Sequence, residues 1–243
     1  MSNKITKALI FAAGLGTRLK PFTDFHPKAL FKVNGKTLLE RNIEYLKQYG
    51  IDDIIINVHH FADQIIQHAE ANNNWGINIS FSDERDSLLD TGGGLLKAAP
   101  FFKSTDNFLL YNADILTNLH LEGMMNFHLQ HLPMVTLSVS ERKSSRYFLF
   151  NHQDRLCGWE NTLTGEQKIK NIQPDLQQRA FSGIHIVNKS LLSTKKSIEK
   201  CSITDWYLDI CTHQNIMGYI DNEAKFIDVG KVESLPEAEK LFF

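Results

Sequence analysis

The stretch from Ala8 to Leu30 constrains the fold of this 243-residue chain more than any other feature of its sequence. Residues 8–13 form an uninterrupted apolar run, which is typical of a short strand buried on both faces. The run leads directly into Gly14-Leu15-Gly16, where the absence of side chains exposes backbone N–H groups. A strand that ends in such a glycine-rich turn favours a site for phosphate.

Two cations follow the glycines within the same stretch. Arg18 carries a planar fork of donors and Lys28 a point charge, and a polyphosphate can use both. Pro21 and Pro27 stiffen the chain between them. The sequence shows no obvious carboxylate partner beside either cation, so we expect both to serve phosphate charge rather than stability.

Two common phosphate motifs are incomplete here. The dinucleotide fingerprint G-x-G-x-x-G requires a third glycine where this chain has Leu19, which disfavours a dinucleotide-dependent dehydrogenase. The Walker pattern G-x-x-x-x-G-K-[ST] is absent as well. A plain turn with two surface cations would explain a short G-x-G, but the spacing G-x-G-T-R-L-x-P-x-T-x-x-x-P-K-x-L is far longer than such a turn requires.

The composition excludes several classes of protein. With 42% hydrophobic and 22% charged residues the chain is an ordinary globular protein, and its net charge of −2 gives no reason to expect nucleic acid as a partner. Cys157, Cys201 and Cys211 form no C-x-x-C pair, so we expect reduced thiols and a cytoplasmic location rather than disulfides or zinc. No signal peptide or apolar stretch approaching the ~20 residues of a membrane span is recognisable, so we expect no membrane partner.

Hydrophobic periodicity predicts alternating strands and helices. Thr37 and Glu40 have the spacing of a capping box, and Gly50 ends the helix that they begin. A strand over 54–58, a helix over 61–71 and a strand over 77–81 follow, and this order favours a parallel sheet covered by helices. We expect further strands at 108–111, 134–139, 180–187, 216–220 and 225–227, and further helices at 121–131, from Ser202 or Thr204 to about His213, and at 233–241.

A second glycine-rich segment, Asp90-Thr91-Gly92-Gly93-Gly94, opens a short helix that Pro100 closes. Three successive glycines are costly in chain entropy, so a mere linker explains them poorly. A backbone pressed against a flat ring or a phosphate explains them better, although a simple turn remains the alternative.

Two carboxylates follow predicted strands. Asp114 comes after the strand at 108–111, on the edge where parallel α/β sheets bind ligands, and Asp228 directly follows the strand at 225–227, two residues before Gly230. Either residue would also serve as a capping or turn aspartate. We favour metal ligation, because Mg²⁺ sites are commonly built from one or two carboxylates plus substrate phosphates.

The chain changes character after Glu141. Strands over 147–150 and 155–159 read as a hairpin, and the polar residues 162–178 read as a surface excursion. Trp159 offers an apolar face for a sugar ring, and Glu160 can accept hydrogen bonds from hydroxyls. The alternative is an amphipathic hairpin with Trp159 in a small core.

Five segments spread over nearly the whole chain carry a resemblance: the opening loop, Thr-Gly-Gly-Gly, Asn-Ala-Asp, Phe-Ser-Gly-Ile and Asp-Val-Gly. Together they resemble the sugar-1-phosphate nucleotidylyltransferases. The resemblance implies an α/β three-layer sandwich, a single domain around a Rossmann-like, mostly parallel mixed sheet with a small acceptor-binding lobe. Residues 1–140 would mainly bind nucleotide, 141–215 would mainly bind sugar phosphate, and 216–243 would return strands, a metal ligand and the C-terminal helix.

The resemblance also implies roles for individual residues. Catalysis is expected from Arg18 and Lys28, and Mg²⁺ binding from Asp114 and Asp228. The expected nucleotide-binding residues are Ala12, Ala13, Gly14, Gly16, Thr17, Thr91, Gly92 and Gly93. The expected sugar-phosphate-binding residues are Asn112, Arg142, Arg146, Trp159, Glu160, Ser182 and Gly183.

The chain departs from the family pattern at two positions. Ala113 stands where a glycine usually precedes the aspartate, which predicts an ordinary backbone there. Asn161 stands where many members have the lysine that meets the sugar phosphate, and Arg142 or Arg146 is the candidate to replace it.

The implied reaction joins a nucleoside triphosphate to a sugar 1-phosphate and releases pyrophosphate. We expect UTP and N-acetylmuramate 1-phosphate as the substrates, with GTP and a mannose or heptose 1-phosphate as the alternative. A non-catalytic nucleotide-sugar sensor is a remoter alternative, because such a protein would be expected to lose Asp114, Asp228 or Lys28. The oligomeric state stays open.

Overall fold

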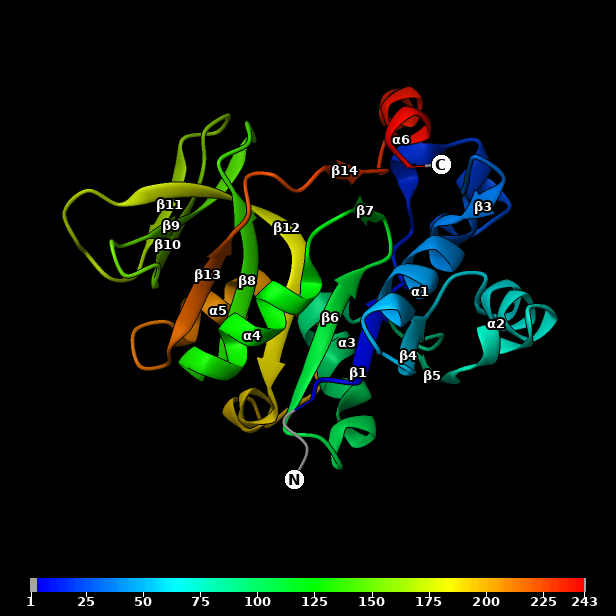
Figure 1. The fold of residues 1–243 in the computed structure, drawn as a ribbon, viewed down its shortest axis with the longest axis horizontal. Helices are drawn as coiled ribbons and strands as arrows, with labels where there is room; N and C mark the ends of the chain where they lie inside the picture. Colours follow the sequence, from blue (N-terminus) through cyan, green and yellow to red (C-terminus); the bar gives the residue numbers. More distant parts are fainter. Residues whose placement is uncertain (1–3, 243) are drawn as a thin grey trace.

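The computed structural model describes residues 4–242, and a central mixed sheet organises them (Figure 1). Four parallel strands form one half of this sheet, in the order β6-β1-β4-β5. Their bounds are β1 Lys7–Phe11, β4 Asp53–Val58, β5 Asn78–Asp83 and β6 Asn107–Asn112. The predicted parallel sheet is therefore confirmed.

Helices cover both faces of the sheet, as alternating side chains on β1 illustrate. Ile10 lies in a buried cluster with residues of α1, α2 and α4, whereas Leu9 lies in a second cluster with residues of α3 and α5. The helices are α1 Leu38–Gln48, α2 Ala62–Ala71, α3 Asp90–Ala98, α4 Leu121–His131, α5 Ile203–Ile210 and α6 Leu235–Leu241. The predicted three-layer arrangement follows directly from these two clusters.

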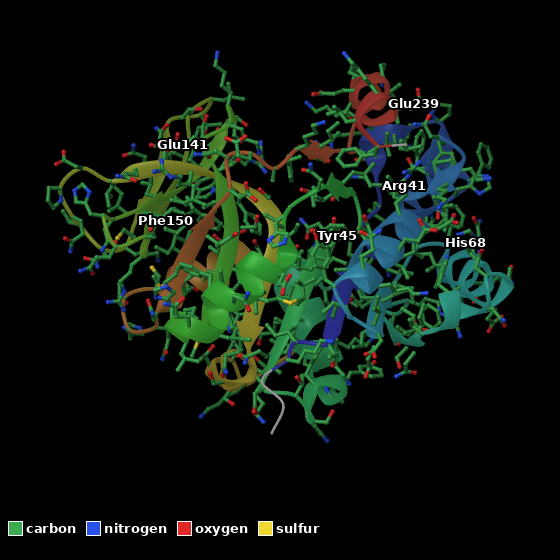
Figure 2. The ribbon with its side chains drawn as sticks, in the orientation of Figure 1. Arg41, Tyr45, His68, Glu141, Phe150 and Glu239 are labelled. Carbon is green, nitrogen blue, oxygen red and sulfur yellow. The ribbon has the colours of Figure 1, made fainter. Side chains whose placement is uncertain are left out.

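The capping signals predicted for α1 operate as expected. Thr37 Oγ1 accepts a hydrogen bond from the Glu40 N–H at 3.1 Å, and Gly50 has the positive φ of 77° that a glycine tolerates. Tyr45 and Arg41 both project from this helix (Figure 2). The Tyr45 hydroxyl donates to the Leu119 carbonyl at 2.6 Å, which ties α1 to the segment before α4.

The other half of the sheet is largely antiparallel. Its central strand is β12, which pairs with β6, β8 and β9. Phe150, at the end of β9, lies in the buried cluster that includes residues of α5 (Figure 2). The strands of this half are β8 Val135–Ser140, β9 Arg146–Phe150, β10 Leu156–Asn161, β11 Glu166–Ile169, β12 Gln177–Asn188 and β13 Ile216–Ile220. Strands β9, β10 and β11 form a lobe at one end of the molecule (Figure 1).

The predicted surface excursion over residues 162–178 is largely exposed, as expected, but it contains an element that was not predicted. This is the edge strand β11, which pairs antiparallel with β10. The segment lacks apolar alternation because an edge strand with one open side is kept polar, which discourages pairing with other chains.

Two small sheets complete the fold. Strand β14 (Phe226–Asp228) pairs antiparallel with β7 (Ile115–Thr117), and in Figure 1 it crosses the top of the view toward α6. The register sets Asp228 opposite Ile115 and hence beside Asp114. A short hairpin is formed by β2 (Lys32–Val33) and β3 (Lys36–Thr37). Over residues 4–242, each helix is too short or too polar to cross a membrane.

Candidate active site

Two cavities meet at the carboxyl ends of the parallel strands, as expected for ligand sites of α/β sheets. The first, here called the strand-end cavity, has about 370 Å³ and is lined by residues 11–14, Lys28 and Glu84 among others. The second, the hairpin cleft, has about 790 Å³ and is lined by side chains of the lobe, such as Trp159, and by Asp228. Thr91, Asn112 and Asp114 line both cavities, so the two are contiguous.

The backbone amides at the base of the strand-end cavity are already bonded. Asn57 Oδ1 accepts from the N–H groups of Ala12 and Ala13 at 2.6 and 3.2 Å. Its Nδ2 donates to Glu84 Oε1 at 2.8 Å, and burial raises the pKa of Glu84. Both residues line the cavity, so their expected contact with a nucleotide stays a prediction, but their amides are already bonded to Asn57.

Sequence reasoning missed Asn57 and Glu84. The available signal was a buried polar residue near the end of an apolar strand, Ile54-Ile55-Ile56-Asn57-Val58. Such a side chain needs a partner inside the protein. The partner could not be named from the sequence, because Glu84 follows β5, the next strand along the sheet.

The two glycines of the first loop differ in function. A Cβ on Gly14 would meet nothing within 4 Å, and Gly14 opens onto the strand-end cavity. Gly16 has a φ of 61°, and a Cβ there would lie 2.9 Å from the Cβ of Lys28. Gly16 is thus required for the loop to pass over Lys28. Thr17 begins the 3₁₀ turn Thr17–Leu19, is exposed and lines neither cavity.

The glycine row of α3 packs against the protein itself. The Gly92 N–H donates to the Cys201 carbonyl at 2.8 Å, and a Cβ on Gly92 would lie 2.9 Å from that oxygen. A Cβ on Gly93 would overlap the Glu199 carbonyl oxygen. The close approach of chain 199–201 therefore explains these glycines, and the expected contact of Gly92 and Gly93 with a nucleotide is corrected. Thr91 alone of the three lines the cavities.

Lys28 lies between the two predicted metal ligands. Its ammonium donates to Asp114 Oδ2, and its Nζ is 3.9 Å from Asp228 Oδ1. The Asp114 carbonyl also accepts from the Val229 N–H at 2.9 Å, so β14 holds the two aspartates together. The expectation that Lys28 lacks a carboxylate partner was wrong, because Asp228 and Asp114 reach it only through the fold.

The electrostatics of the pair suit a cation. Burial, followed by the nearby carboxylate of Asp114, raises the pKa of Asp228, while Lys28, Arg18 and Arg142 oppose that shift. Two converging carboxylates present the hard oxygen donors that Mg²⁺ prefers, with room left for substrate oxygens. Within residues 4–242 no group of three or more His, Cys, Asp or Glu side chains forms a complete metal cage. Two carboxylates are an incomplete ligand set by themselves, and they fit a metal only if substrate oxygens supply the remaining ligands.

Arginines line the hairpin cleft. The Arg142 guanidinium donates through Nη2 to the Phe181 carbonyl at 2.8 Å and lies 4.1 Å from the centroid of the Phe226 ring. Burial lowers the pKa of Arg142, yet an arginine remains charged. Arg18 and Arg146 line the same cleft and are exposed. All three can therefore meet an anionic ligand there.

Strand alternation separates Trp159 from Glu160. Trp159 lines the cleft, as does Asn161, whereas Glu160 is 8% exposed and lies on the opposite face. The Glu160 carboxylate accepts hydrogen bonds from Gln167 Nε2, at 2.9 Å, and from Gln178 Nε2. The expected role of Glu160 in binding sugar hydroxyls is therefore corrected.

The same alternation divides the Phe-Ser-Gly-Ile segment of β12. Gly183 lines the cleft with a φ of 73°, and a Cβ there would lie 2.8 Å from Asn112 Nδ2. Ser182 is buried and does not line the cleft, so its expected contact with sugar phosphate is corrected.

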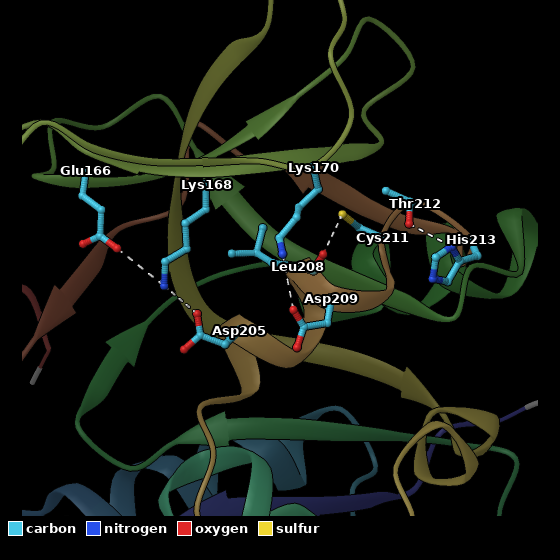
Figure 3. Close-up of polar contacts among 9 residues, drawn as sticks. All are labelled: Glu166, Lys168, Lys170, Asp205, Leu208, Asp209, Cys211, Thr212 and His213. Atoms are coloured by element: carbon cyan, nitrogen blue, oxygen red, sulfur yellow. Dashed lines mark hydrogen bonds and ion pairs between the residues drawn. The ribbon is translucent and has the colours of Figure 1, made fainter.

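Ion pairs attach the lobe to α5 (Figure 3). Lys168 Nζ is 2.9 Å from Asp205 Oδ1, and Lys170 Nζ is 3.4 Å from Asp209 Oδ1. These pairs are partly exposed, so each contributes little energy alone. They nevertheless attach β11 and the residue that follows it to α5.

The fold and the site together define a class: an α/β protein with a cation and two carboxylates where a nucleotide-sized cavity meets a second cleft. Residues 7–242 match the family described as Nucleotidyl transferase, and the chain belongs to this family. The predicted resemblance is thereby confirmed.

Relatives and solved structures refine this likeness. The chain is 39% identical over 237 residues to the N-acetylmuramate alpha-1-phosphate uridylyltransferase of Neisseria meningitidis, covering 97% of both chains. It is 28% identical over 228 residues to a mannose-1-phosphate guanyltransferase of Gibberella zeae, covering 93% of this chain but 61% of that relative. The crystal structure of HddC from Yersinia pseudotuberculosis matches with a TM-score of 0.80 at 24% identity, covering 98% of this chain and 100% of that one. This last likeness concerns the fold alone.

Proposed function

We propose that this protein transfers a uridylyl group from UTP to N-acetylmuramate 1-phosphate, releasing pyrophosphate. The observation that carries the proposal is the convergence of Lys28, Asp114 and Asp228 where the strand-end cavity meets the hairpin cleft. The likeness to the Neisseria meningitidis relative over 97% of both chains supports the choice of substrates.

The two cavities suggest where each of the two substrates binds. The nucleoside triphosphate occupies the strand-end cavity, beside Gly14 and Thr91, and the sugar 1-phosphate occupies the hairpin cleft. An oxygen of the sugar phosphate attacks the α-phosphorus in line, a new P–O bond forms, and the bond to pyrophosphate breaks. Because no protein nucleophile is needed, catalysis consists of positioning and neutralising charge.

Lys28 and Arg18 supply the positive charge. Lys28 stands at the junction of donor and acceptor and steadies the charge that builds up on the α-phosphate. Arg18 is exposed and lines the hairpin cleft, next to the junction with the strand-end cavity in this proposal, and binds the departing phosphates. Asp114 and Asp228 would hold Mg²⁺, which when bound neutralises phosphate charge as a Lewis acid.

Arginines replace the missing acceptor lysine in this proposal. Arg142 and Arg146 face the cleft near Asn161, where the family pattern has that lysine. One arginine meets the sugar phosphate and the other the lactyl carboxylate, with Trp159 against the sugar ring. Such charge-assisted contacts discriminate against sugars that lack the carboxylate.

A guanylyltransferase is the second candidate. The specific observation in its favour is the likeness to the Gibberella zeae relative, a mannose-1-phosphate guanyltransferase. Residues 1–140 would mainly serve the nucleotide and 141–215 the sugar phosphate in either case.

A cytoplasmic location is also part of this proposal. It is supported by the free thiols of Cys157, Cys201 and Cys211.

The experiment is a matrix of specificity constants. Pyrophosphate release is measured for UTP and GTP with the 1-phosphates of N-acetylmuramate, N-acetylglucosamine, mannose and heptose. Asp114→Asn serves as the inactive control, and Asp106→Asn, at an exposed ion pair with Lys189, as its matched surface control. We expect UTP with N-acetylmuramate 1-phosphate to win. If GTP with a neutral sugar wins by tenfold, or about 1.4 kcal/mol, the uridylyl assignment is wrong. Release from no pair rejects nucleotidylyl transfer itself.

A further inference from the structure

His185 is a buried titratable side chain to which neither the motifs nor the proposed mechanism gives a function. It lies on β12, two residues after Gly183, is 1% exposed and lines the hairpin cleft. Its ring meets Phe181 edge-on, with the centroids 4.6 Å apart. Its Nδ1 lies 2.7 Å from the hydroxyl of Tyr207, a fully buried residue of α5.

The pairing with Tyr207 determines the tautomer of His185. Within the part of the chain that the structure describes, His185 is the one hydrogen-bond partner of the Tyr207 hydroxyl. Because a buried hydroxyl must place its hydrogen on an acceptor, Tyr207 donates to Nδ1 of His185. A neutral imidazole that accepts at Nδ1 carries its hydrogen on Nε2. The ring stays neutral, since burial lowers the pKa of His185 to about 3.

The second ring nitrogen is left unpaired. Among residues 4–242, Nε2 of His185 has no hydrogen-bond partner. His185 lines the hairpin cleft, so a ligand that fills the cleft cuts this donor off from water, and a ligand oxygen that accepts from it is favoured. Anionic groups have Lys28, Arg142 and Arg146 as partners, whereas a neutral N–H suits an uncharged oxygen.

We propose that His185 Nε2–H donates a hydrogen bond to an uncharged oxygen of the acceptor sugar, a hydroxyl or an amide carbonyl, and that Tyr207 is the positioning residue that selects this tautomer. The inference rests on the proposed function, because it takes the hairpin cleft as the acceptor site. His185 thereby contributes to sugar specificity, while the cations contribute to phosphate and carboxylate binding.

Three variants test kinetically whether His185 donates to the sugar and whether Tyr207 positions it. His185→Phe combined with Tyr207→Phe keeps both rings and leaves no unpaired buried hydroxyl; we expect the KM for the acceptor to rise about tenfold, with kcat and the KM for UTP nearly unchanged. In His185→Gln the amide oxygen can accept from Tyr207 while its NH₂ donates into the cleft, so this variant restores most of the affinity. Tyr207→Phe alone frees the tautomer and gives an intermediate KM. His152→Gln, at an exposed position before β10, is the matched control.

The expected pattern separates specificity from structure. A merely structural His185 would lower the melting temperature in all three variants and would leave the acceptor KM unmoved. Equal acceptor KM values in the wild type and the double Phe variant would overturn the inference, provided that wild-type turnover is normal. Absence of wild-type turnover with every sugar phosphate instead rejects the proposed function.

A spectroscopic test does not need turnover. In the full chain labelled with ¹⁵N-histidine, with the His185 signals assigned by His185→Gln, we expect an unprotonated Nδ1 and a protonated Nε2. Titration with N-acetylmuramate 1-phosphate should shift the Nε2 signal more than that of His152. A proton on Nδ1, or an Nε2 signal that saturating sugar phosphate leaves unmoved, contradicts the proposal.

Discussion

The ammonium of Lys28 lies 3.9 Å from the carboxylate of Asp228, although one residue follows the first loop and the other ends β14. Asp114 joins them, because the same ammonium donates to its Oδ2. The ammonium that is proposed to meet the α-phosphate is therefore bonded to the two carboxylates that are proposed to hold Mg²⁺. In the proposed function, Lys28 would exchange these contacts for phosphate when both ligands bind.

Replacement of Lys28 tests both its proposed contribution to catalysis and its contribution to stability. Lys28→Ala should lower kcat/KM at least 100-fold, because it removes a charge directed at the reacting phosphate. It should also lower the free energy of unfolding by about 1–2 kcal/mol, since the Lys28 side chain is 12% exposed and hydrogen-bonded to Asp114. Steady-state kinetics and urea unfolding measure the two effects.

Lys20→Ala is the control for the Lys28 variant. Lys20 lies in the same loop, is 60% exposed and pairs with Asp24 at 2.9 Å. Its loss should leave both activity and stability nearly unchanged. Normal activity in Lys28→Ala, with or without lost stability, would reduce Lys28 to a structural ion pair.

Asp228→Asn should stabilise the metal-free protein at pH 7. The folded-state pKa of Asp228 is raised, so its ionisation costs stability as the pH rises above the ordinary value of about 3.9. The variant should therefore melt higher than the wild type at pH 7 in EDTA, and the difference should shrink as the pH falls toward 4. Added Mg²⁺ should raise the melting temperature of the wild type and not of the variant.

The result for Asp228 also bears on catalysis. Turnover of Asp228→Asn at saturating Mg²⁺ should fall strongly while the fold persists. A variant that melts lower than the wild type in EDTA at pH 7 would show that the ion pair with Lys28 outweighs burial. Near-normal turnover at low Mg²⁺ would refute the metal assignment.

Features that depend on neighbouring residues could be predicted from the sequence. The strands, the capping box at Thr37 and the carboxylates at strand ends rest on local periodicity and spacing. Strand alternation alone places Trp159 and Glu160 on opposite faces, but which of the two faces meets the cleft could not be predicted, because it depends on the hairpin register.

Contacts between distant segments were also beyond the sequence. The glycines at 92 and 93 suggested a close approach, and the structure provides one, but its partner is the carbonyl-bearing chain at 199–201. The partner of Asn57 likewise lies on another strand end, at Glu84. Such pairings arise from the assembled sheet, so a pattern within one segment indicates that a partner exists without naming it.

Two glycine substitutions separate packing from binding. Gly93→Ala should lower the free energy of unfolding by about 1–3 kcal/mol, because its Cβ overlaps the Glu199 carbonyl. Gly14→Ala should change stability by less than about 0.5 kcal/mol, since a Cβ there meets nothing within 4 Å. Gly14→Ala should instead raise the KM for UTP, because Gly14 lines the strand-end cavity. Stability of Gly93→Ala equal to that of the wild type would argue against the packed glycine row.

Neighbouring substitutions on β10 test which face of the lobe meets the sugar. Trp159→Leu should raise the KM for the acceptor several-fold, because the ring lines the hairpin cleft, and should also lower stability, because the ring packs against the cluster that includes α5. Glu160→Gln should affect stability alone: its new amide opposes the donors of Gln167 and Gln178, which costs about 1 kcal/mol, while the acceptor KM stays constant. Acceptor kinetics and urea unfolding of both variants measure this. If Glu160→Gln weakens acceptor binding and Trp159→Leu does not, the lobe presents its other face to the substrate, and the cleft is not the acceptor site.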